Sequence, residues 1–188
     1  AAKKNQILRK IETYKKALRK EKTMFKAYHD GGGYRYAIAE LYFELGDYTF
    51  KIDTFKIVDG LFEGLHTLQG KGYQFIIITN QGGISKGVYN HEDVRILHEH
   101  MLECFRENNI EILDVYYCPH HSINEKCICR KPDSLMLEKA MARYEVDKST
   151  AYFIGDSRRD VLAAEKVGIK GVLVKSNDRI TNYLKEIF

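Results

Sequence analysis

Residues 73–83 read YQFIIITNQGG, and this stretch decides the fold class of the chain. A short, β-branched apolar run without polar alternation is typical of a strand that is buried on both faces of a parallel sheet. The run ends at Thr79, and Asn80, Gln81 and two glycines follow it. Free backbone N–H groups in such a loop can bind an anion beside the Thr79 hydroxyl, although an ordinary turn has the same composition.

Strands and helices alternate through the remainder of the chain. In a parallel sheet each strand is connected to the next by a helix that packs on one face. We therefore predict an α/β fold, a Rossmann-like three-layer parallel sheet, with ligand-binding residues just after the strands. The apolar periodicity places helices at 58–70, 91–108, 134–144 and 160–167, and strands at 73–79, 112–117, 151–154 and 171–174.

The N-terminal part of the chain has a different character. We predict a basic helical segment over 1–47 and the α/β domain over 48–188. Apolar residues recur with a helical period over 5–28, whereas 34–45 fits either a helix or a strand followed by a turn. Residues 1–22 hold nine Lys and Arg against two Glu, in a chain of net charge +4. A solvated helix face explains this charge better than nucleic-acid binding, and a protein partner for the helix is a further possibility.

Three of the four cysteines lie close together in one loop. Cys118 with His120, and Cys127 with Cys129, form two closely spaced pairs separated by six residues. Three thiolates and one imidazole complete a tetrahedron around Zn²⁺ and leave no open position, which is typical of a structural ion. His121 is the alternative imidazole ligand. We therefore predict a structural zinc site in this loop.

The cysteines and the apolar runs also indicate a compartment. A metal site suits a reducing environment better than a disulfide framework does, and Cys104 lies in a helical pattern as a small apolar group. The longest apolar runs, such as 75–78, are far shorter than the roughly 18 residues that span a bilayer. No apolar signal core follows the basic N-terminus. We expect a cytoplasmic protein without a membrane segment.

A second group of polar residues follows the strand predicted at 151–154. Asp156 and Asp160 are four residues apart at the start of a helix, so their carboxylates face the same way. Such hard oxygen ligands suit Mg²⁺, which also takes waters and a substrate phosphate. Asp156 as a simple helix cap is the alternative. Arg130 and Lys131 directly follow the cysteine loop, which would hold them toward an anion.

Four motifs in this order resemble the haloacid dehalogenase superfamily of phosphotransferases: ITNQGGISKG, YYCPHH, CICRKP and FIGDSRRDVLAAEKVGI. They look in particular like its zinc-bearing branch, which contains heptose bisphosphate phosphatases and histidinol-phosphate phosphatase domains. The resemblance extends over about 48–174. It implies a phosphatase domain, Mg²⁺ and a structural Zn²⁺.

The resemblance also implies roles for individual residues. Thr79 would bind the transferred phosphoryl group, Lys131 would neutralise it, and Asp156 would bind Mg²⁺ with support from Asp160. Zinc would take the four ligands already named, Cys118, His120, Cys127 and Cys129. Asn80, Gln81 and Arg130 would contact the substrate.

The chain departs from the family at the nucleophile. The family begins with a strand that ends in DxDGT, where the first Asp attacks phosphorus and the second moves a proton. Before residue 145 no two acidic residues of this chain are two positions apart. Three alignment frames fail to rebuild the pair: Leu45 with Asp47, Glu44 with Gly46, and Ala37 with Ala39. Asp47 is our candidate for the second acid.

Two functions follow as expectations. The first is Mg²⁺-dependent hydrolysis of a small phosphorylated sugar, with a heptose 1,7-bisphosphate favoured over histidinol phosphate because Arg130 suits a small anionic sugar. The second is a catalytically inactive relative that binds a phosphorylated ligand or acts as a scaffold, which the missing carboxylate pair favours. A phosphorylated sugar that binds but stays unhydrolysed for hours would favour the second function over the first.

Overall fold

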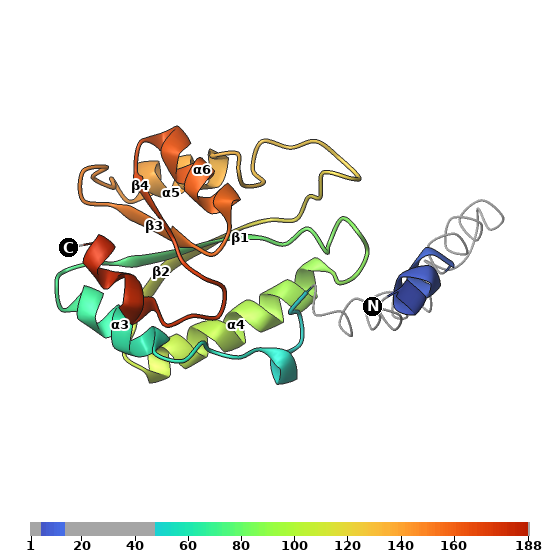
Figure 1. Ribbon diagram of the computed structural model, residues 1–188, viewed down its shortest axis with the longest axis horizontal. Helices are drawn as coiled ribbons and strands as arrows, with labels where there is room; N and C mark the ends of the chain where they lie inside the picture. Colours follow the sequence, from blue (N-terminus) through green and yellow to red (C-terminus); the bar gives the residue numbers. More distant parts are fainter. Residues whose placement is uncertain (1–4, 14–47, 188) are drawn as a thin grey trace.

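The computed structural model of the protein describes residues 5–13 and 48–187. Residues 5–13 are helical, in agreement with the start of the helix predicted over 5–28; the remainder of that helix, the segment 34–45 and Asp47 lie outside the described residues. The elements of 48–187 follow the predicted alternation (Figure 1). They are η1 (Ile52–Thr54), α3 (Leu61–Gln69), β1 (Phe75–Asn80), α4 (His91–Glu107), β2 (Ile112–Cys118), α5 (Leu135–Arg143), β3 (Tyr152–Gly155), α6 (Arg158–Val167), β4 (Lys170–Leu173) and η2 (Ile180–Glu186).

The four described strands form two parallel pairs. β1 pairs with β2, ending with Asn80 opposite Cys118, and β3 pairs with β4, ending with Gly155 opposite Leu173. A helix connects the two strands of each pair, as the sequence predicts: α4 in the first and α6 in the second. The predicted parallel α/β fold is therefore confirmed, but its strands do not form one continuous sheet in the described residues.

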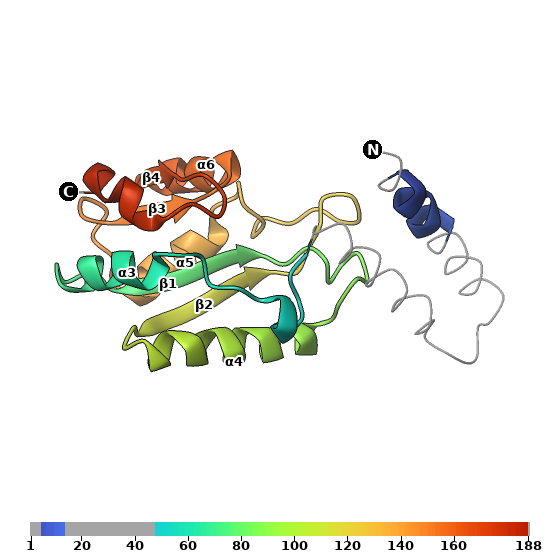
Figure 2. The same cartoon turned by 60° about the horizontal axis from the view of Figure 1, so that its bottom comes forward.

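Helices cover both faces of the strands, so the molecule has three layers (Figure 2). On one face α3, α4 and η2 enclose an apolar cluster that includes Ile110 and Val172, both almost fully buried. On the other face α5 and α6 pack around Leu137 and Ala163. Successive strand residues contribute to opposite clusters, which is why the strands have a continuous apolar sequence.

Some boundaries differ from the sequence predictions. The helix expected from residue 58 begins at Leu61, because Gly60 has a left-handed backbone with φ 72° that a helix cannot continue through. The strand expected over 73–79 spans Phe75–Asn80, so Thr79 is the second-last residue of β1 rather than its end. Within 5–13 and 48–187, no helix is both long enough and apolar enough to cross a membrane. The domain boundary after residue 47 stays a prediction.

Candidate functional site

Lys131 connects the carboxyl ends of β1 and β3. Its Nζ lies 2.8 Å from Asp160 Oδ1 and donates a hydrogen bond of 2.7 Å to the main-chain carbonyl of Ile78. The Lys131 and Asp160 side chains leave only 10% and 7% of their surface exposed. Lys131 is therefore held in place by its partners and is not a mobile surface residue. It stands where the ends of two separate strands meet.

Asn80 holds the main chain of Lys131 from two sides. Its Nδ2 donates to the Lys131 carbonyl at 3.1 Å, and its Oδ1 accepts from the Lys131 N–H at 3.0 Å. Sequence reasoning assigned Asn80 to substrate contact, and it missed this contact across 51 residues of chain. The geometry makes Asn80 a positioning residue for Lys131.

A second chain of hydrogen bonds fixes Thr79. Gln81 Nε2 donates to Thr79 Oγ1 at 3.3 Å, and Gln81 Oε1 accepts from the Tyr89 hydroxyl at 2.6 Å. Burial raises the pKa of Tyr89 well above its ordinary value, so the phenol stays protonated and donates. A Cβ on Gly83 would lie 2.1 Å from the Tyr89 ring, which explains one of the two loop glycines. Sequence reasoning missed Tyr89.

Ser157, rather than Asp156, caps α6. Ser157 is the N-cap, and Asp160 Oδ2 accepts from the Ser157 N–H at 3.1 Å in a capping box. Asp160 thus uses one oxygen for the helix and the other for Lys131. A Cβ added to Gly155 would lie 2.5 Å from the Cβ of Asp160, so only glycine fits at this position. Asp156 is exposed at the carboxyl end of β3. An exposed carboxylate offers oxygen atoms of the kind that Mg²⁺ takes as ligands, and Asp160 contacts Lys131; the Mg²⁺ roles of both residues stay predictions.

The cysteine loop gathers four ligand atoms. The thiolate or imidazole atoms of Cys118, His120, Cys127 and Cys129 all lie within 4.8 Å of one another. The Sγ atoms of Cys118 and Cys127 are 3.7 Å apart, and His120 Nδ1 is 3.6 Å from Cys118 Sγ. Zn–S bonds of about 2.3 Å at tetrahedral angles require sulfur separations of about 3.7 Å. The Cys118–Cys127 separation matches this value and the Cys118–Cys129 separation of 3.1 Å is shorter, while the donor set of three thiols and one imidazole fits Zn²⁺. It is the one such group of three or more residues in the described part of the chain.

The geometry favours His120 over His121 as the imidazole ligand. His121 Nδ1 accepts a hydrogen bond of 3.2 Å from the Ile123 N–H and lies outside the four-residue group. Burial raises the pKa of the Cys118 thiol, with hydrogen bonding to Cys129 acting in the same direction. Bound Zn²⁺ would reverse this preference, because a coordinating thiol is deprotonated.

Arg130 lies between the cysteine loop and the loop after β1. Its Nη1 donates to the His120 carbonyl at 2.9 Å, and it would be 2.7 Å from a Cβ on Gly82. Arg130 is half-buried, and its guanidinium borders the anion loop that the sequence predicted. Of the predicted catalytic residues, Thr79 lies between Ile78 and Asn80, which both bond Lys131, and Asp47 lies outside the described residues.

Comparisons with known proteins agree with this fold. A family model described as HAD-hydrolase-like matches residues 128–185. Over 141 residues the chain is 37% identical to the D-glycero-β-D-manno-heptose-1,7-bisphosphate 7-phosphatase of Haemophilus ducreyi, covering 71% of this chain and 78% of the relative. Over 131 residues it is 37% identical to the D-glycero-α-D-manno-heptose-1,7-bisphosphate 7-phosphatase of Campylobacter jejuni, covering 70% and 74%.

A solved structure shows the same fold. The D,D-heptose 1,7-bisphosphate phosphatase of B. bronchiseptica, in complex with magnesium and phosphate, superposes with a TM-score of 0.64 at 24% identity, covering 74% of this chain and 77% of that one. The relatives at 37% identity and the matching family model define the class, a hydrolase of the haloacid dehalogenase type. The chain belongs to this superfamily, in the branch of the heptose bisphosphate phosphatases.

Proposed function

We propose that this protein is a Mg²⁺-dependent phosphatase that hydrolyses a D-glycero-D-manno-heptose 1,7-bisphosphate or a closely similar sugar phosphate. The names of its relatives at 37% identity, heptose-1,7-bisphosphate 7-phosphatases, support this substrate class. One observation of this chain carries the proposal: a buried lysine, held by Asp160 and Asn80, is bonded to the carbonyl of Ile78, the residue before Thr79, at the carboxyl end of β1.

Phosphoryl transfer depends mainly on positioning and on stabilising the charge of the equatorial oxygens. In this proposal the Lys131 ammonium neutralises that charge, and the Thr79 hydroxyl and the N–H groups of the loop after β1 donate to it. Asp156 would hold Mg²⁺, which supplies further positive charge when bound. Because Lys131 is already oriented by its partners, little reorganisation is needed on binding.

The zinc site has a structural role in this proposal. Cys129 is separated from Lys131 only by Arg130, so an ion held by the four ligands would fix the position of both basic side chains. A closed tetrahedral site leaves no ligand position for a substrate. We therefore propose that zinc shapes the rim and that Arg130 contacts the sugar phosphate.

The attacking carboxylate is the element that the described residues do not supply. Among them, Asp160 is the acidic side chain that contacts Lys131, and it has the role above. Glu44 would have to attack, with Asp47 as the second acid in another alignment frame, and both lie outside the described residues. A ligand-binding protein without turnover is the second candidate, and the absence of an acidic pair two positions apart before residue 145 favours it.

Phosphate release from both anomers of the heptose bisphosphate, with and without Mg²⁺, tests the proposal. The phosphatase proposal expects Mg²⁺-dependent release that Lys131→Met reduces by about 10²-fold or more. A sugar phosphate that binds in a calorimeter but stays intact for hours would support the second candidate. If the sugar phosphate is neither bound nor hydrolysed, both candidate functions are excluded.

A further inference from the structure

Two loops meet beside the carboxyl ends of β1 and β2. One is the loop after β1, residues 81–88, and the other is the cysteine loop, residues 118–129, so both extend from the same end of a parallel pair (Figure 1). The main-chain N–H of Gln81 donates to the Cys118 carbonyl at 2.7 Å, and that of Ser85 donates to the Pro119 carbonyl at 3.1 Å. The first turn of the loop after β1 is therefore attached at both ends to the start of the cysteine loop.

Between these two attachments the loops are in direct contact at Gly82. A Cβ on Gly82 would lie 3.1 Å from the His120 carbonyl oxygen, 3.0 Å from the His121 ring and 2.7 Å from Arg130 Nη1. Gly82 is buried, and within 5–13 and 48–187 no acceptor bonds its main-chain N–H. A buried N–H without a partner is costly, so this group is suited to an anion oxygen.

A side chain of the cysteine loop holds the far end of this turn. Asn124 Nδ2 donates to the Ser85 carbonyl, across 39 residues of chain. Asn124 is itself held in a turn, because its N–H and that of Glu125 donate to the His121 carbonyl at 2.9 and 3.1 Å. The His121 ring adds to this turn by accepting from the Ile123 N–H at 3.2 Å. The backbone of the cysteine loop therefore sets the position of the Asn124 amide.

The Ser85 hydroxyl takes no part in this junction. Its Oγ is buried and has no hydrogen-bond partner among the residues that the structure describes. Ser85 is therefore held through its main chain, by the bond from its N–H to Pro119 and the bond from Asn124 to its carbonyl. Only the second bond involves a side chain, so a substitution of Asn124 can release the loop after β1 without changing the sequence of that loop.

The other side of the loop after β1 is held independently of the cysteine loop. The Tyr89 hydroxyl donates to Gln81, and the Phe50 ring stacks on the Tyr89 ring with centroids 5.3 Å apart. Gln81 in turn donates to the Thr79 hydroxyl. Loss of the Asn124 amide should therefore loosen the loop at Ser85 and leave the hold on Thr79 intact.

We propose that Asn124 is a positioning residue that holds the Ser85 carbonyl from the cysteine loop and so fixes the direction of the Gly82 N–H toward a bound phosphate. The proposal rests on the phosphate-binding role proposed above for the loop after β1. It extends that role, because the cysteine loop then supports the phosphate donors after β1 as well as Arg130 and Lys131. A hydrogen bond of this kind corresponds to a change of about 2- to 10-fold in affinity.

Calorimetric titration of the full chain with inorganic phosphate and Mg²⁺, combined with ¹H–¹⁵N NMR spectra, tests this proposal. Asn124→Ala should weaken phosphate binding by about 2- to 10-fold and shift the Gly82 and Ser85 amide resonances of the free protein. The zinc content should equal that of the wild type, because Asn124 is outside the ligand group. If the alanine variant loses zinc, Asn124→Leu decides, since leucine keeps the approximate shape of the side chain and removes the donor.

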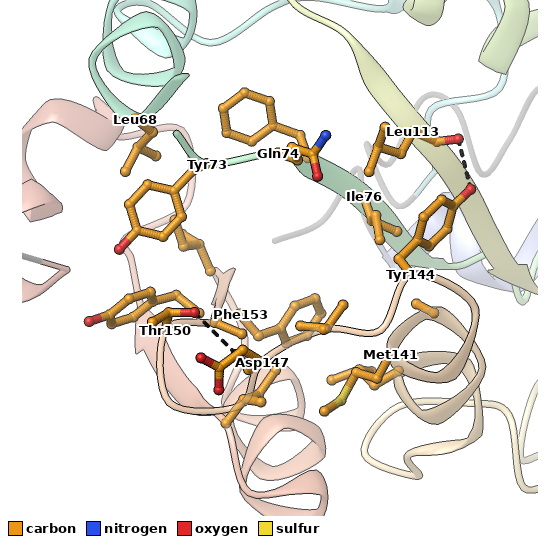
Figure 3. Close-up of a pocket in the computed structure, with 18 of the residues that line it drawn as sticks. Leu68, Tyr73, Gln74, Ile76, Leu113, Met141, Tyr144, Asp147, Thr150 and Phe153 are labelled. Carbon is orange, nitrogen blue, oxygen red and sulfur yellow. Dashed lines mark hydrogen bonds between the residues drawn. The ribbon is translucent and has the colours of Figure 1, made fainter. Parts of the chain in front are cut away.

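Two control variants separate this effect from a general loss of stability. Asn182→Ala removes a similar exposed hydrogen bond, from Asn182 Nδ2 to Asp178 Oδ1 at 3.0 Å, and should leave phosphate binding unchanged. Met141→Ala shortens a side chain that lines a cavity of about 590 Å³ between β1 and β3, none of whose lining residues belongs to either loop (Figure 3). It should lower the melting temperature without weakening phosphate binding.

The inference and the proposed function can fail separately. Wild-type phosphate affinity and unshifted Gly82 and Ser85 resonances in Asn124→Ala would overturn the inference, as would equal losses of affinity in Asn124→Ala and Met141→Ala. If the wild-type protein binds no phosphate, the proposed function fails, and the resonances of the free protein decide whether Asn124 holds the loop.

Discussion

The Lys131 ammonium and the Asp160 carboxylate form a buried ion pair, 2.8 Å apart, between the end of the cysteine loop and the first turn of α6. Asp160 also completes the α6 capping box, and Lys131 also donates to the Ile78 carbonyl. The pair therefore joins the end of the cysteine loop, β1 and α6 at one point. This arrangement positions the lysine for an anion and makes its partner costly to remove.

Removal of one partner should strongly destabilise the protein. Lys131→Met leaves the Asp160 carboxylate buried without its cation, and a loss of about 3–5 kcal/mol of unfolding free energy is expected. The double variant Lys131→Met with Asp160→Asn should lose less than the two single variants together, because no unpaired charge remains. Urea unfolding measures these values.

An exposed ion pair provides the control. Lys166 Nζ lies 2.7 Å from Asp133 Oδ1, with both side chains about half exposed. Lys166→Met should cost less than about 1 kcal/mol because water screens this pair. Equal losses for Lys131→Met and Lys166→Met would contradict the role given to burial.

Loss of a cysteine ligand should release zinc. Cys129→Ser should lower the bound metal from one ion per chain toward zero, and reduce the melting temperature, because metal binding contributes directly to folding. Cys104→Ser, which changes a cysteine outside the ligand group, should retain the metal. Elemental analysis of the purified variants gives the metal content, and zinc retained by Cys129→Ser would argue against this site.

The Tyr89 hydroxyl should affect turnover more than stability. Tyr89→Phe removes the donor to Gln81 and so loosens the hold on Thr79, and a 3- to 10-fold loss of kcat/KM (a rough range) is expected with about 1 kcal/mol of destabilisation. Tyr144→Phe removes a comparable hydrogen bond to the Leu113 carbonyl and should have the same stability cost with unchanged turnover. Identical kinetics for the two variants would remove Tyr89 from the site.

Stability should fall as the solution is acidified through the range in which His98 titrates. Burial lowers the pKa of His98, which packs at 5.7 Å against the Tyr117 ring, below its ordinary value of 6.5. The unfolded chain therefore binds a proton that the folded chain resists, so this contribution is complete above about pH 6.5 and is lost as the pH falls below it. Urea unfolding between about pH 7.5 and 5.5 should show a shallower decline for His98→Gln than for the wild type, and the exposed His66→Gln should not differ.

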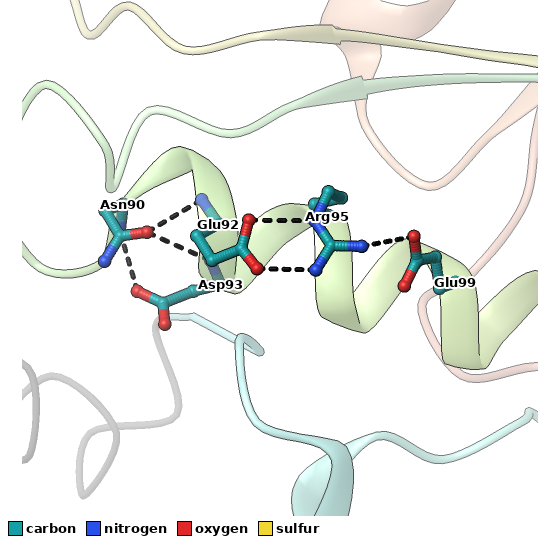
Figure 4. A network of polar contacts seen from close by, with 5 residues as sticks. All are labelled: Asn90, Glu92, Asp93, Arg95 and Glu99. Carbon is teal, nitrogen blue, oxygen red and sulfur yellow. Dashed lines mark hydrogen bonds and ion pairs between the residues drawn. The ribbon is translucent and has the colours of Figure 1, made fainter.

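Much of the fold follows from local signals that the sequence carries. Asn90 illustrates this: its Oδ1 accepts from the N–H groups of Glu92 and Asp93, and Asp93 accepts in return, which starts α4 where the sequence predicts (Figure 4). Along the same helix Arg95 bonds Glu92 and Glu99 on the exposed side. Such caps involve neighbours in the chain, so their residue types and spacing suffice to predict them.

The contacts that complete the site involve residues far apart in the chain. The sequence indicates that Thr79 ends a strand, that Asp160 follows one and that Lys131 follows the cysteine loop. The Lys131–Asp160 pair and the Asn80 amide on the Lys131 main chain depend instead on how these separate segments are placed in the fold. The contact between the Tyr89 ring and Gly83 is equally hidden in the sequence, because it forms only when the loop after β1 folds back on itself. No spacing rule in one sequence identifies such contacts.

The separation of the two strand pairs could not be predicted for a different reason. The alternation of strands and helices predicts that β1 pairs in parallel with β2, and β3 with β4. How the two pairs lie relative to each other depends on contacts between distant segments, which local periodicity does not encode.

Phosphate release from D-glycero-D-manno-heptose 1,7-bisphosphate by the purified full chain tests the central claim most directly. Wild-type protein with Mg²⁺ should release one phosphate per sugar at a rate that Lys131→Met lowers by about 10²-fold, while Lys166→Met has no effect. Release that is independent of Mg²⁺ and equal in all three proteins, or no release above buffer, would contradict the claim.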